Sequence, residues 1–176
     1  MTVELLLYND FVKSATKKEL EKIALELAKN KKQWHFHLLT PSCKFNKQKE
    51  HAFILENNSD NEYYVFYNDK PAMDLGKKLL SVLHGRDILG ERSKKSSISN
   101  STRKILDRAK RLNNEGKHWH HHVFFPICLF NKHAGKWNIT FEDQLTGVTL
   151  ESVSEVEPKD DQKEIETLYY LQKTIT

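Results

Sequence analysis

Residues 34–47 read WHFHLLTPSCKFNK, and residues 119–132 read WHHHVFFPICLFNK. Eight of the 14 positions are identical, whereas unrelated segments match at about one position in 14. The identical pairs are Trp34/Trp119, His35/His120, His37/His122, Pro41/Pro126, Cys43/Cys128, Phe45/Phe130, Asn46/Asn131 and Lys47/Lys132. The two motifs are separated by about half of the 176-residue chain. This spacing predicts a chain built from two equivalent units.

The same order of predicted elements surrounds both motifs, namely a helix, three strands and a second helix. In the first half the elements are a helix over 17–30, strands over 34–40, 51–56 and 63–67, and a helix over 71–84. In the second half they are a helix over 102–113, strands over 118–125, 137–142 and 148–153, and a helix over 158–172. A short apolar run at 3–8 predicts one further strand.

This order predicts an α+β fold made of an internally duplicated α-β-β-β-α unit with pseudo-twofold symmetry. We expect antiparallel sheets with helices packed on one face. Residues 1–84 would form the N-terminal unit and residues 101–176 the C-terminal unit. Residues 85–100 are rich in serine and basic residues, which predicts a flexible basic linker.

The overall composition favours a cytoplasmic protein without a membrane partner. Hydrophobic residues make up 38% of the chain and charged residues 30%, and no apolar run approaches 18 residues. In such a chain the two cysteines are expected to be thiols or metal ligands, unless the predicted twofold axis pairs them as a disulfide. Internal symmetry leaves both a monomer and a homodimer open.

The histidines of the two motifs are the candidate metal ligands. Alternate residues of a strand share a face, so His35 and His37 point the same way, as do His120 and His122. Imidazole and thiolate both suit zinc, with manganese as an alternative. The predicted ligands are His35, His37, Cys43, His120, His122 and Cys128. Either two histidines of each motif meet at one metal, or each motif holds its own site with its cysteine.

Two carboxylates add a catalytic hypothesis. Glu56 and Glu142 end the strands that follow the two motifs, where they could act as ligands or as a general base. We predict metal-dependent hydrolysis of a phosphate-containing substrate, with His120, His122 and Glu142 as catalytic residues. The second motif is favoured because residues 118–133 contain five histidines.

The charge distribution suggests where such a substrate would bind. Residues 86–117 carry ten Lys or Arg against four Asp or Glu, whereas residues 141–166 carry nine acids against two lysines. The basic stretch is a candidate surface for a nucleotide or nucleic acid. A solvated helix face is the alternative interpretation.

Two short resemblances give more specific hypotheses. His35-Phe36-His37 resembles the His-hydrophobic-His motif of HUH single-strand nucleases, and Tyr170-Leu-Gln-Lys173 resembles their Tyr-x-x-Lys motif. This resemblance implies a metal on the histidines and Tyr170 as the nucleophile. His118-Trp-His120-His-His122 is similar to the histidine-triad pattern, which implies a metal-free nucleotide hydrolase or transferase with His120 as the nucleophile.

A non-enzymatic protein is the remaining hypothesis. The repeated histidines and cysteines could hold a structural zinc, or could simply pack in the core. The basic and acidic stretches would then contact a partner or each other. Trp34 and Trp119 face away from the paired histidines in either case, and we expect them in the hydrophobic core.

Overall fold

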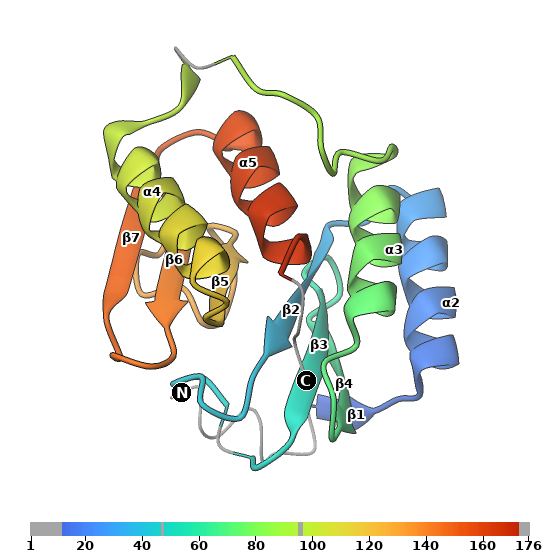
Figure 1. The fold of residues 1–176 in the computed structure, drawn as a ribbon. Coiled ribbons are helices and arrows are strands. Elements are labelled where there is room, and N and C mark those ends of the chain that lie inside the picture. The colour runs from blue at the N-terminus through green and yellow to red at the C-terminus, as the bar shows by residue number, and fades with distance from the viewer. Residues whose placement is uncertain (1–11, 47, 95–96, 173–176) are drawn as a thin grey trace. The chain divides into compact units, whose positions relative to one another are not determined.

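The computed structural model describes residues 12–46, 48–94 and 97–172 (Figure 1). In this part of the chain the elements are β1 (Val12–Ser14), α2 (Lys17–Lys29), β2 (Trp34–Leu39), β3 (His51–Asn57), β4 (Glu62–Asn68), α3 (Met73–His84), α4 (Asn100–Asn114), β5 (Trp119–Phe124), β6 (Trp137–Asp143), β7 (Thr149–Ser154) and α5 (Lys159–Tyr170). They fall into two compact units. Unit 1 holds the chain up to Asp87 together with Cys128–Phe130, and unit 2 holds Ile88–Ile127 and the chain from Asn131 onward.

Unit 1 contains a four-stranded sheet in the order β1-β4-β3-β2. β2, β3 and β4 form an antiparallel meander, and β1 pairs in parallel with β4. Helix α2 begins at a capping box between Thr16 and Glu19. Helices α2 and α3 lie side by side against the sheet (Figure 1). The core between them contains Leu20, Ala24, Leu27, Trp34, Phe53, Leu55, Ala72, Leu75 and Leu79.

Alternation along β2 separates this core from a polar face. Trp34 belongs to the core, with Phe36 and Leu38 packed against it. His35 and His37 therefore project from the opposite face of the same strand. The sequence prediction for Trp34 is confirmed.

Unit 2 contains a three-stranded antiparallel sheet in the order β5-β6-β7. Helices α4 and α5 contact each other and pack on β7 and β5, respectively. Trp119 is buried between the sheet and α5, where its ring centroid lies 5.4 Å from that of Phe141 and 5.7 Å from that of Tyr169. His120 and His122 project from the other face.

The predicted α+β class is confirmed, with four helices and two antiparallel-rich sheets in the described residues. The parallel β1–β4 pair was not predicted, because Val12–Ser14 is too short to show an alternating apolar pattern. The strand expected at 3–8 lies outside the described residues. Internal duplication and pseudo-twofold symmetry stay predictions. Cys43 and Cys128 are buried thiols that form no disulfide.

Some residues of the predicted linker make hydrogen bonds with α5. The Gly90 amide donates to Thr167 Oγ1 at 3.0 Å, and the Ser93 amide donates to Glu164 Oε1 at 3.1 Å.

Among the helices of the described ranges, none is long and apolar enough to cross a bilayer.

Candidate metal centre

Four potential metal ligands meet in unit 1, and we call them the first set: His35, His37, Glu56 and Cys128. The two histidines alternate along β2, and antiparallel pairing places Glu56 of β3 directly opposite His35. All four residues are buried, with exposed fractions between 0% for Glu56 and 5% for Cys128. The sheet register therefore supplies three ligands, and a distant segment supplies the fourth.

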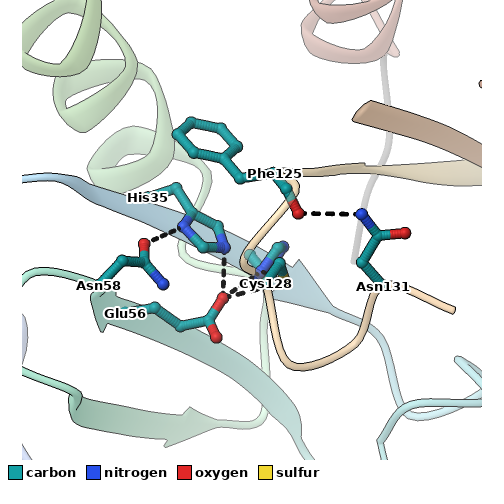
Figure 2. Close-up of polar contacts among 7 residues, drawn as sticks. His35, Glu56, Asn58, Phe125, Cys128 and Asn131 are labelled. Carbon is teal, nitrogen blue, oxygen red and sulfur yellow. Dashed lines mark hydrogen bonds and ion pairs between the residues drawn. The ribbon is translucent and has the colours of Figure 1, made fainter. Parts of the chain in front are cut away.

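The ligand atoms of the first set converge on one carboxylate oxygen (Figure 2). His37 Nε2 lies 2.8 Å from Glu56 Oε2, and Cys128 Sγ lies 3.2 Å from the same oxygen. His35 Nε2 also contacts it, and Cys128 Sγ lies 3.3 Å from His37 Nε2. All four ligand atoms lie within 4.8 Å of one another. Zinc binds nitrogen and sulfur ligands at about 2.0–2.3 Å. Ligand atoms that lie this close to one another can therefore contact a single ion placed between them.

An amide outside the set orients His35. Asn58 Oδ1 lies 2.6 Å from His35 Nδ1 (Figure 2). An amide oxygen only accepts hydrogen bonds, so Nδ1 carries the proton and donates it. With Nδ1 protonated, Nε2 is the nitrogen of a neutral His35 that would coordinate a metal ion. A carboxamide or carboxylate partner of this kind is usual behind a metal-bound histidine.

The protonation states in the first set also suit a cation. Burial lowers the pKa of His37, which favours the neutral imidazole that metals bind. Burial alone would raise the pKa of Glu56, but the neighbouring His35 and His37 lower it well below its usual range. Glu56 is therefore ionised at neutral pH and provides negative charge in the buried set.

A second set of three ligands occupies the equivalent face of unit 2. His120 and His122 alternate along β5, and Glu142 of β6 is paired directly opposite His120. His120 Nε2 lies 2.9 Å from Glu142 Oε2. Gln144 Nε2 donates to His120 Nδ1 at 2.9 Å, so an amide also contacts this histidine, but here the imidazole nitrogen accepts the hydrogen bond. The three ligands are at most 8% exposed.

A fixed turn presents Cys128. Asn131 Nδ2 donates to the carbonyl oxygens of Phe125 at 2.9 Å and Lys136 at 2.7 Å (Figure 2). Asn131 therefore caps this turn. Phe130 anchors the same segment, with its ring 5.5 Å from those of His37 and Phe45.

The first motif contains the same turn. Asn46 Nδ2 donates to the carbonyl oxygens of Thr40 at 3.0 Å and Glu50 at 2.8 Å. Cys43 is buried in this turn, with 2% of its surface exposed. The two asparagines of the motifs therefore make similar hydrogen bonds in their turns.

Other histidines of the second motif have different surroundings. His121 faces α5, where its Nε2 lies 3.3 Å from Glu166 Oε1 and its ring packs on Tyr169. His133 pairs with Glu151 at 3.1 Å. Neither belongs to the grouped ligands.

The predicted nucleophiles have unfavourable environments. Burial, and then the charge of Glu166, raises the pKa of Tyr170 well above its usual range, so its phenol stays protonated. Lys173 of the same motif lies outside the described residues. His120, the nucleophile that the histidine-triad resemblance implies, is only 1% exposed and contacts Glu142. A phosphate group would have to displace that contact.

Sequence reasoning missed two features of these sets. Asn58 and Gln144 were not recognised, although each follows a strand-ending glutamate by two residues. The grouping of Cys128 with the histidines of the first motif was also missed, because a repeat does not show which unit a loop joins. Nothing among known protein families, curated proteins or solved structures matches this chain, so its function is inferred from the site chemistry.

Proposed function

We propose that this chain is a zinc protein in which buried metal centres stabilise the fold. The observation that carries the proposal is the convergence of His35, His37, Glu56 and Cys128 within 4.8 Å of one another. Two imidazoles and a thiolate select zinc over magnesium or calcium, which prefer oxygen ligands. Manganese is disfavoured for the same reason, because the set contains a single carboxylate.

The electrostatics of Glu56 support a bound cation. Its side chain is fully buried and ionised. Among the described residues its Oε1 atom has no hydrogen-bond partner. A buried carboxylate is costly unless it is paired or bound to a metal. A divalent ion between the ligands would neutralise the carboxylate and the Cys128 thiolate together.

The ligand count favours a structural role for the first centre. Catalytic zinc usually has three protein ligands and keeps a position for water, whereas structural zinc is closed by four protein ligands. The first set supplies four buried ligands. We therefore assign it to stability rather than to the metal-dependent hydrolysis predicted from the sequence.

The second centre would use His120, His122 and Glu142, which all belong to unit 2. Three protein ligands are the number typical of a zinc ion that keeps a position for water.

A phosphate-binding surface is a second candidate function. Helix α4 exposes Arg103, Lys104, Lys110 and Arg111. A shallow hollow between α4 and Leu150 is lined by three cations, Lys104, Arg108 and Arg111, and by one acid, Asp107. The clustering of cations on one helix favours a polyanion such as a nucleic acid.

Elemental analysis tests the zinc proposal. The full chain, purified without a histidine tag, should contain close to two equivalents of zinc. His35→Ala and His120→Ala should each remove about one equivalent, and His133→Ala, outside both sets, should remove none. Absence of metal even after refolding with zinc would overturn the proposal.

A further inference from the structure

The two ligand faces differ beyond the metal ligands. Glu142, Thr140 and Asn138 alternate along β6 and project from one face. Thr140 is paired opposite His122, and Asn138 opposite Phe124. In unit 1 the position opposite His37 is Ile54, and the position opposite Leu39 is Ala52. The second set thus continues into polar residues where the first continues into apolar ones.

Several atoms of these polar side chains are buried without a hydrogen-bond partner in the described part of the chain. Asn138 is 0% exposed and Thr140 is 1% exposed. Thr140 Oγ1, both amide atoms of Asn138 and Glu142 Oε1 have no hydrogen-bond partner among the described residues. Buried polar atoms are almost always hydrogen-bonded in folded proteins, frequently to an ordered water. A row of four such atoms beside a metal set indicates a small ligand that the protein holds there.

We propose that the second metal centre has an exchangeable coordination position, occupied by water and open to small anions. This inference rests on the proposed zinc function. Thr140 lies beside His122 on the neighbouring strand, where its hydroxyl can hydrogen-bond a metal-bound water. Asn138 lies about 7 Å further along β6, where it can hold a second water next to the first.

The two centres then have different roles, one structural and one open to exchange with solvent. Ile54 and Ala52 offer the first set no hydrogen bond, so that centre is closed and structural. The second centre adds solvent to its protein ligands. A metal-bound water at this position would be the group that a phosphate or carboxylate oxygen could replace.

Cobalt substitution tests this inference on the full chain. Cobalt(II) replaces zinc and gives visible bands that respond to coordination number. Azide, added to protein loaded with two equivalents of cobalt, should change the bands of one equivalent in a saturable way. The response should persist in Cys128→Ser, which weakens the first centre, because the responding metal is in the second.

Thr140→Val and Asn138→Ala are the decisive variants, since valine keeps the shape of threonine without its hydroxyl. Each should bind cobalt fully but need at least tenfold more azide for the same response, whereas Ile54→Val should behave as the wild type. An unchanged azide response in both variants, or no response from a fully loaded wild type, would overturn the exchangeable position. If His120→Ala and wild type bind the same amount of cobalt, the second metal centre itself is wrong.

Discussion

The thiol of Cys128 lies 3.2 Å from the Glu56 carboxylate, although 72 residues separate them in the chain. The glutamate comes from the strand after the first motif, and the cysteine comes from the turn inside the second. A metal bound at this point would join distant segments, and closing such a long loop restricts the unfolded chain. Zinc binding would therefore be part of the folding free energy.

Removing this thiol should destabilise the protein through loss of metal. In Cys128→Ser we expect one equivalent of zinc to be lost and the free energy of unfolding to fall by about 3–5 kcal/mol, the usual cost of leaving a buried charge without its partner. Zinc content and thermal unfolding of the same preparation measure both effects. A stable Cys128→Ser variant with full zinc would show that the thiol only packs.

The amide behind His35 should tune zinc affinity without changing the number of sites. Asn58→Ala removes the acceptor 2.6 Å from His35 Nδ1. Loss of such a partner typically weakens metal binding about 10–100-fold. Competition with a chromophoric chelator measures the change, and Asn58→Asp, which keeps the accepting oxygen, should restore most of the affinity. Equal affinity in wild type and Asn58→Ala would mean that this contact is incidental.

Tyr170 should remain a protonated phenol at alkaline pH. Burial and the nearby Glu166 raise its pKa, so residue 170 should contribute no phenolate near pH 10, where an ordinary tyrosine titrates. The ultraviolet titration of wild type minus that of Tyr170→Phe isolates its signal, and Tyr169→Phe is the matched control. A Tyr170 phenolate at or below pH 10, or a Tyr170-dependent covalent DNA adduct, would restore the nuclease hypothesis.

The α4 surface should bind nucleic acid through charge alone. Lys104→Glu/Arg111→Glu should weaken binding of a single-stranded oligonucleotide, and should lower the slope of log K against log salt by about 2, one for each lost phosphate contact. The same charge change at exposed positions of α2, Lys18→Glu/Lys22→Glu, is the control. If both double variants weaken oligonucleotide binding equally, the binding depends on the net charge of the protein and not on the α4 surface.

Much of the fold was predictable because its signals are local. Helical spacing in Lys17–Lys29 and period-two alternation in Trp34–Leu39 each identify an element and its buried face. β1 was not predicted because a strand of three residues is too short to show an alternating apolar pattern. The predicted strand ends placed both glutamates near the histidines.

The membership of the metal sets was harder to predict. Alternation puts His35 and His37 on one face, but a sequence does not reveal which unit the Cys128 turn joins. Buried, unpartnered atoms such as Thr140 Oγ1 are likewise visible only after strands are paired and packed. The candidate ligands on each strand were therefore predictable from the sequence. Which ligands from different strands and turns come together in one set was not.

X-ray absorption at the zinc edge is the sharpest test of the first centre, with the His120→Ala variant used to leave it as the occupied site. We expect one sulfur at about 2.3 Å and three nitrogen or oxygen neighbours at about 2.0–2.1 Å, with the sulfur lost in the His120→Ala/Cys128→Ser double variant. A zinc shell without sulfur, or a protein that holds no zinc, would contradict the centre formed by His35, His37, Glu56 and Cys128.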